Sequence, residues 1–268
     1  MLQAIIVGHV VCVTCLLGQA VPEVAVVVNG GSFQERIAPG AIVSIFGNDL
    51  ADRTEVSAGI PLATELSGIT ITFNGKPAPL LGVFDGVFNQ INAVVPWQLG
   101  KASSASVVAW RGGEAITEPL EVQVSEIAPA MFEFPPGSGE GIVTFNPNTG
   151  FSTWARCNGP SPRPGEIVVI WLTGLGAVDV AVVDGLPGPL APLAVPLAEV
   201  KVLFDGVEAE ILAVLLHPTL VGLFQINAIV PPDLDLGGLA QDTEFPLVIE
   251  AGGVRSKELT ICVGAKLD

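Results

Sequence analysis

The stretch Gln-Ile-Asn-Ala-Val-Val-Pro at residues 90–96 returns almost unchanged as Gln-Ile-Asn-Ala-Ile-Val-Pro at residues 225–231. In the first copy Ile91, Ala93 and Val95 alternate with Gln90, Asn92 and Val94, which is the period-two pattern of a half-buried β-strand. The closing proline cannot donate a hydrogen bond to a neighbouring strand. Each copy therefore predicts one strand that ends at its proline.

Further motifs recur in the same order in the two halves of the chain. The matching pairs are Pro-Gly with an apolar run at 39–45 and 164–170, Phe-Asn-Gly at 73–75 with Phe-Asp-Gly at 204–206, and Gly-Gly at 112–113 and 252–253. Matches that keep their order while the loops between them change length predict a tandem duplication of one unit.

Each unit contains about seven short apolar runs separated by turn residues, and no stretch has helical periodicity with good caps. This pattern favours an all-β fold of two tandem immunoglobulin-like β-sandwiches. We expect a first domain at 21–132, a linker rich in Pro and Gly at 133–140, and a second domain at 141–268.

The first twenty residues are apolar and end in Gly18-Gln19-Ala20, a small-x-small pattern that predicts a cleaved secretory signal peptide at 1–20 and export to the cell surface or beyond. No Lys or Arg precedes the apolar run, so an uncleaved anchor or a misplaced start codon are alternatives. Cys12 and Cys15 have the spacing of a redox pair but lie inside this run, where signal-peptide cysteines are the interpretation. A lipid anchor on Cys15 is a lesser alternative.

Charge and hydropathy exclude several classes of partner. The 268 residues carry 27 acidic and 11 basic side chains, for a net charge of −16, which nucleic acid and anionic lipid repel. The mean hydropathy of +0.61 is that of a membrane protein, yet beyond residue 20 every apolar run is too short to span a bilayer. We expect no nucleic acid partner and no membrane contact after signal removal.

The sequence resembles the uncharacterised C-terminal domain family of secreted acidobacterial (Solibacter-type) proteins, whose halves are similar to IPT/TIG-like immunoglobulin-like domains. The stretches that carry the resemblance are 28–33, 38–40, 90–97, 128–132, 173–176 and 221–227. The resemblance implies an extracellular or cell-surface β module without known catalytic residues. The chain departs from the family at Phe224, where a Tyr is usual, and at His217-Pro218-Thr219, where the family has Ala-Pro-Gly.

The inventory of catalytic groups is poor. His217 is the only histidine after residue 20, and no Gly-x-Ser-x-Gly motif supplies a nucleophile. One histidine and two cysteines do not make a closed zinc site. We therefore predict that the protein is not an enzyme, that it has no cofactor, and that His217 lies in a surface loop.

Calcium is the one metal for which the sequence offers candidate ligands, because several acidic residues lie in predicted loops. Asp49 and Asp52 follow one predicted strand, and Asp179 and Asp184 follow the equivalent strand of the second copy. Loop oxygens of this kind are calcium ligands. The alternative is ordinary solvated loop charge.

Exposed tryptophans would allow the module to bind carbohydrate. Trp97 follows a strand end and Trp154 lies in a polar loop, so these two are the candidate ligand-contact aromatics; Trp171 lies in an apolar strand and is expected in the core. The favoured function is a non-catalytic module for adhesion, protein interaction or spacing. The alternative is a carbohydrate-binding or accessory module of polysaccharide degradation, so the partner is an unidentified protein or glycan at the cell surface.

Two cysteines remain after signal removal. Cys157 lies near the start of the second unit and Cys262 in its last strand. The first and last strands of an immunoglobulin-like sandwich often run side by side, so a disulfide between these cysteines is compatible with the fold and with export.

Overall fold

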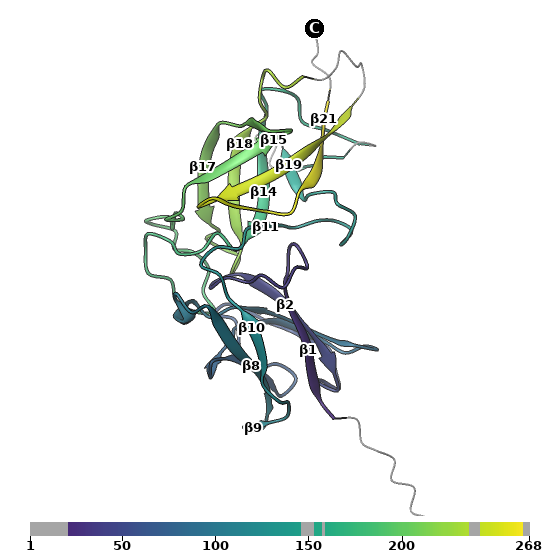
Figure 1. Cartoon of the computed structure of the whole chain (residues 1–268), viewed down its shortest axis with the longest axis vertical. Coiled ribbons are helices and arrows are strands. Elements are labelled where there is room, and N and C mark those ends of the chain that lie inside the picture. The colour runs from purple at the N-terminus through teal and green to yellow at the C-terminus, as the bar shows by residue number, and fades with distance from the viewer. Residues whose placement is uncertain (1–20, 146–152, 157–158, 236–241, 265–268) are drawn as a thin grey trace, which may run out of the picture.

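The computed structural model describes residues 21–145, 153–156, 159–235 and 242–264, and it contains two β-sandwiches that follow one another along the long axis (Figure 1). The described residues form four antiparallel sheets and one short 3-10 helix, η1 (Trp97–Leu99). None of their helices has the length and apolar character needed to cross a membrane. The predicted signal peptide, 1–20, lies outside the described residues.

The first sandwich pairs one sheet of five strands with a second sheet built around two long strands. The first sheet has the order β1 (Glu23–Asn29), β2 (Ile42–Asn48), β7 (Asn89–Val94), β6 (Leu80–Phe84), β3 (Glu55–Val56). The second has the order β10 (Leu120–Gln123), β8 (Ser104–Arg111), β4 (Ile69–Phe73), β5 (Lys76–Pro77), and β9 (Glu114–Ala115) also pairs with β8. This is the A-B-E-D and G-F-C order of the immunoglobulin fold.

The second sandwich repeats this order. Its first sheet runs β13 (Thr153–Trp154), β12 (Val143–Phe145), β14 (Ile167–Thr173), β18 (Phe224–Ile229), β17 (Ile211–Leu216), with β11 (Ala130–Met131) also paired to β14. Its second sheet runs β16 (Val207–Glu208), β15 (Val200–Phe204), β19 (Thr243–Ala251), β20 (Val254–Arg255), with β21 (Leu259–Val263) also paired to β19. The predicted fold of two immunoglobulin-like sandwiches is confirmed.

The duplicated motifs occupy equivalent places in the two sandwiches. The two Gln-Ile-Asn-Ala copies are β7 and β18, each paired with the strand that follows a Pro-Gly turn, β2 or β14. Ile91 and Ala93 are fully buried while Gln90 and Asn92 are half-buried, as the alternation predicts. Asn74 and Asp205 have positive φ before a glycine, the requirement of a tight hairpin turn.

The chain passes from one sandwich to the other earlier than the predicted linker. The amide of Ser125 donates to Ile37 in the first sandwich, whereas the amide of Ala128 donates to Gly174 in the second. Ala130 and Met131 then pair with β14. The crossing therefore lies between 125 and 128.

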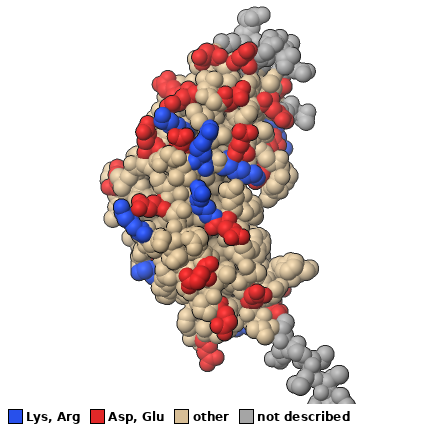
Figure 2. Space-filling model, in the orientation of Figure 1, with Lys and Arg blue, Asp and Glu red and all other residues tan. Residues whose placement is uncertain are grey.

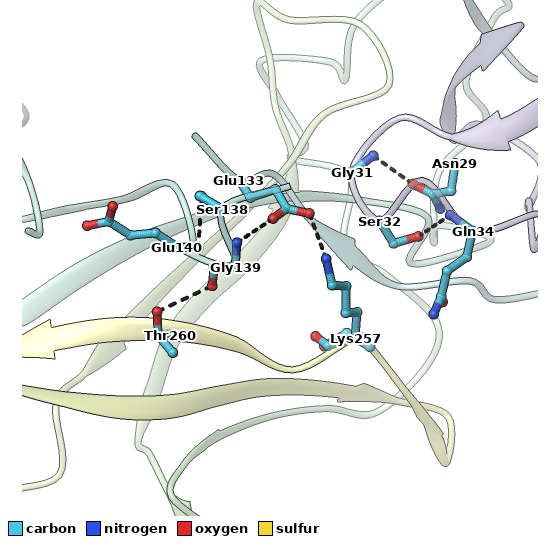
Figure 3. Close-up of polar contacts among 11 residues, drawn as sticks. Asn29, Gly31, Ser32, Gln34, Glu133, Ser138, Gly139, Glu140, Lys257 and Thr260 are labelled. Carbon is cyan, nitrogen blue, oxygen red and sulfur yellow. Dashed lines mark hydrogen bonds and ion pairs between the residues drawn. The ribbon is translucent and has the colours of Figure 1, made fainter. Parts of the chain in front are cut away.

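The segment expected as the linker, 133–140, folds onto the second sandwich as a turn beside β21 (Figure 3). Glu133, whose side chain is 1% exposed, accepts a hydrogen bond from the Gly139 amide and an ion pair at 2.8 Å from Lys257 Nζ. The Thr260 amide donates to Gly139 O at 2.7 Å. These contacts bind the Pro-Pro-Gly segment to the second core rather than leaving it as a hinge.

Candidate functional site at the junction of the sandwiches

A buried threonine connects the two sandwiches by hydrogen bonds. Thr173, at the end of β14, is fully buried, and its Oγ1 accepts from the Ile42 amide of the first sandwich at 2.9 Å. The same hydroxyl donates to Gly222 O at 2.8 Å. A β-carbon on Gly222 would lie 2.9 Å from Ile42 and 3.1 Å from Val94. Val94 is therefore buried by the second sandwich, although strand alternation places it on an outer face.

A loop of the second sandwich adds a second connection. Asp184 accepts from the Trp97 amide at 2.8 Å and from Gln98 Nε2 at 3.1 Å, so its carboxylate lies at the start of η1. The next residue, Gly185, accepts a hydrogen bond from the Leu62 amide. Together with Thr173, these contacts fix the orientation of the two sandwiches at separate points.

A groove of about 520 Å³ opens between the sandwiches beside these contacts. Its apolar wall comes from both domains: Pro39, Trp97, Ile127, Leu175, Leu197 and Ala198. The ion pair between Lys101 and Glu126, 3.8 Å apart, lies at its exposed rim. A concave, mostly apolar space of this size at a domain interface is typical of a ligand-binding site.

Trp97 is the candidate aromatic that the structure brings into this groove. It is half-buried and packs against the core of the second sandwich. The ring lies so close to Gly40 that a β-carbon there would collide with it. Gly40 also has φ of +75°, a conformation that glycine adopts without steric cost. The Pro-Gly turn, read from the sequence only as an entry to a strand, therefore also seats Trp97.

The acidic loop residues have other roles than a shared metal site. Asp184 binds the Trp97 amide, and Asp179 Oδ1 accepts from the Val195 amide at 2.8 Å. Within the described ranges no group of three or more His, Cys, Asp or Glu side chains could hold a metal ion. Asp49 and Asp52 lie exposed in the first sandwich. Calcium therefore gains no support from the geometry of these residues.

His217 follows β17 in a loop, as expected, and organises the loop that carries Gly222. Its Nδ1 lies 3.2 Å from the amide nitrogens of Thr219 and Leu220, and accepts from both. Its backbone amide donates to Leu223 O at 2.8 Å. Thr219 Oγ1 also lies 3.2 Å from Nδ1, but the two amides occupy that nitrogen, so it is poorly placed to act as a base toward this hydroxyl.

The loop should make stability depend on pH. Burial lowers the pKa of His217 below its usual value of 6.5. The unfolded chain therefore takes up this proton first as pH falls, and the stability present above pH 6.5 is lost as pH falls toward the lowered pKa. An asparagine at 217 offers Oδ1 to the amide two residues on without titrating. We expect His217→Asn to lose less melting temperature than the wild type between pH 7.5 and 5.0 in thermal denaturation. An equal loss of melting temperature in both proteins would show that the titration of His217 is not the cause of the pH dependence.

Two of the other tryptophans differ from expectation. Trp171 is half-buried on the outer face of its sheet, with Nε1 donating to Thr144 Oγ1 at 3.1 Å and its ring 5.6 Å from that of His217. The prediction that Trp171 belongs to the core is wrong, because the apolar run of β14 supplies both faces of the strand. Trp110 is also half-buried, with Nε1 donating to Thr72. Trp154 was expected in a polar loop, but it lies in β13. Its side chain is outside what the structure describes.

Cys262 is buried and disulfide-bonded. Cys157 and the two cysteines of the N-terminal segment lie outside the described residues, so the pairing of Cys157 with Cys262 stays a prediction. Arg156, the residue before Cys157, lines the same surface hollow as Cys262, which supports that pairing.

No model of a known protein family matches the sequence, and no curated protein is similar to it. Among solved structures, the chain is similar to a Bacteroides ovatus mixed-linkage glucan utilization locus protein, SGBP-B, in complex with a mixed-linkage heptasaccharide (11% identity, 92% of this chain, 47% of that chain, TM-score 0.38). It is also similar to the I9–I11 tandem of titin (9% identity, 91% of this chain, 65% of that chain, TM-score 0.22) and to the tandem Ig repeats of Dlar (12% identity, 92% and 98%, TM-score 0.19). The chain spans about half the length of the first of these.

The strand order and the junction together define a class of protein: a tandem pair of immunoglobulin-like β-sandwiches joined by side-chain to backbone hydrogen bonds and by apolar packing. This is the tandem architecture that the sequence resemblance implied.

Proposed function

We propose that the chain is an exported, non-catalytic interaction module of the cell surface, in which two immunoglobulin-like sandwiches act as one rigid body and present the groove at their junction to a partner. The observation that carries the proposal is the junction itself, where Thr173 and Asp184 bind backbone amides of the other sandwich. A spacer or adhesion unit benefits from a fixed angle between domains, because less freedom is then lost on binding.

The rigid junction can be tested by NMR relaxation. In the wild type we expect backbone ¹⁵N relaxation in both sandwiches to fit one rotational correlation time, since they tumble together. The double variant Thr173→Val, Asp184→Ala removes both connections, and its sandwiches should give separate, shorter correlation times.

The control for this experiment is Asp179→Ala in the same loop, because Asp179 binds an amide of its own domain. Its relaxation should match the wild type. Two independent correlation times in the wild-type protein would refute the proposal.

A second candidate function is carbohydrate binding, which the position of Trp97 in the groove favours. Indole rings present an apolar face that suits the C–H face of a sugar ring. If this function holds, soluble neutral polysaccharides should change the tryptophan emission of the wild type and of Trp110→Phe but not of Trp97→Phe. No change for the wild type would argue against a glycan in the groove.

A further inference from the structure

The outer face of the first sheet of the second sandwich sets an aromatic ring beside two amides. Trp171 of β14 lies directly opposite Gln225 of β18 in the ladder, and Asn227 is the next outward residue on that strand. Ile170 and Ile226, which point the other way, are fully buried in the core. We call Trp171, Gln225 and Asn227 the amide face; all three side chains are half-buried.

The two amides retain capacity for further hydrogen bonds. Gln225 Nε2 donates to Asn227 Oδ1 at 2.7 Å, and within the described part of the chain neither side chain makes another hydrogen bond. An amide carries one acceptor oxygen and an NH₂ donor. Gln225 Oε1 is therefore left as an acceptor and Asn227 Nδ2 as a donor, side by side on one strand.

Trp171 is held in place by its polar edge. Nε1 donates to Thr144 Oγ1, and the ring packs at 54° to the imidazole of His217. The indole N–H is thus satisfied within the protein, so the part of the ring that reaches the surface offers apolar π contact rather than a hydrogen bond.

The equivalent face of the first sandwich differs at two positions, because Phe46 lies opposite Gln90 in place of Trp171, and Ser44 lies opposite Asn92. There Ser44 Oγ donates to Asn92 Oδ1 at 3.0 Å, and Gln90 Nε2 donates to Asn92 Oδ1 at 2.9 Å. The residue in the place of Ser44 is Val169, which faces Asn227 in the ladder and has no polar group. Ser44 therefore takes up a second acceptor site on Asn92 Oδ1, and the ring beside the first pair of amides is the phenyl of Phe46 rather than an indole.

We propose that the amide face binds a neutral polysaccharide. A pyranose ring has an apolar C–H face and an edge of hydroxyls that each donate and accept. One sugar can stack on Trp171 while neighbouring hydroxyls donate to Gln225 Oε1 and accept from Asn227 Nδ2. This site goes beyond the proposed function, whose groove lies at the junction.

Charge selects the class of sugar. The chain has a net charge of −16, and acidic side chains lie over both sandwiches on the face shown in Figure 2. Polysaccharides with carboxylates or sulfates are repelled by this field. A neutral chain meets no such barrier.

The test is isothermal titration calorimetry of the full chain with four soluble neutral polysaccharides, namely β-glucan, xyloglucan, galactomannan and dextran, with polygalacturonate as the anionic control. We expect at least one neutral polymer to bind. The double variant Gln225→Ala, Asn227→Ala should weaken it about tenfold or more, because two hydrogen bonds are lost. The double variant Gln90→Ala, Asn92→Ala, which is the matched change in the first sandwich, should alter the affinity less than about twofold.

A third variant guards against loss of folding. Asn227→Asp keeps the shape of the side chain and an oxygen that accepts from Gln225 Nε2, but it replaces the free Nδ2 donor by an acceptor, so it should weaken binding without lowering the melting temperature of the second sandwich. Absence of binding to every neutral polymer would overturn the proposal. The proposal would also be overturned if Trp97→Phe lost binding while the Gln225→Ala, Asn227→Ala double variant kept it, because the sugar would then lie in the groove. Binding of polygalacturonate more tightly than any neutral polymer would overturn it as well.

Discussion

Replacing Gly40 with alanine should lower the free energy of unfolding by about 2 to 4 kcal/mol. About 1 kcal/mol of this comes from placing a β-carbon at φ of +75°. The rest arises because the new methyl group would enter the ring of Trp97, and overpacking of this kind typically costs about 1 to 3 kcal/mol. Trp97 cannot move away freely, since its amide is bound by Asp184 of the other sandwich.

The second copy provides the matched control. Gly165 occupies the same place in its Pro-Gly turn and has φ of +87°, but no atom lies within 4 Å of its β-carbon position. Gly165→Ala should therefore cost only about 1 kcal/mol. Urea denaturation of the two variants measures the difference, and tryptophan emission should change only in Gly40→Ala. Equal losses would show that Trp97 contributes nothing to the effect.

Replacing Lys257 with alanine should lower the free energy of unfolding by about 2 kcal/mol. The change leaves the Glu133 carboxylate, 1% exposed, without its cationic partner at 2.8 Å. A buried charge that loses its partner is costly. We expect less than for a pair buried on both sides, because the Lys257 side chain is 37% exposed and solvent screens it.

Lys201 is the control for Lys257, because its side chain is also 37% exposed but its partners Glu199 and Glu208 are 81% and 59% exposed. Lys201→Ala should cost less than about 0.5 kcal/mol. Adding Glu133→Gln to Lys257→Ala should recover part of the loss, since the amide oxygen still accepts from Gly139. Thermal denaturation of the four proteins checks this, and a Lys257→Ala loss no larger than that of Lys201→Ala would contradict the role of Glu133.

The sequence predicted the positions of the strands well, but it predicted the burial of individual side chains correctly in some strands and wrongly in others. Alternation around Ile91 placed the core face of β7 correctly, and the turn glycines located the hairpins, because both signals act between neighbours in the chain. The unbroken apolar run of β14 hides which residues face inward. Trp171 was therefore expected in the core, although it lies on the outer face beside Gln225.

The candidate site was only partly visible in the sequence. Trp97 could be singled out as an aromatic after a strand end, but Thr173 and Asp184 have no local signal that marks them as junction residues. Their partners are 131 and 87 positions away along the chain. Contacts of this range depend on how two folded surfaces meet, which no period or turn motif encodes.

By itself, the sequence determined the all-β class, the duplication and the motifs that recur in the same order in both sandwiches. Period-two burial and turn chemistry are local properties, and each copy of the unit carries them independently. Only the tertiary structure decided where the chain crosses between sandwiches, which carboxylate binds Trp97, and which outer faces stay open. Those outcomes follow from packing one folded sandwich against the other, where a hydroxyl, a carboxylate or the absence of a β-carbon can decide the contact.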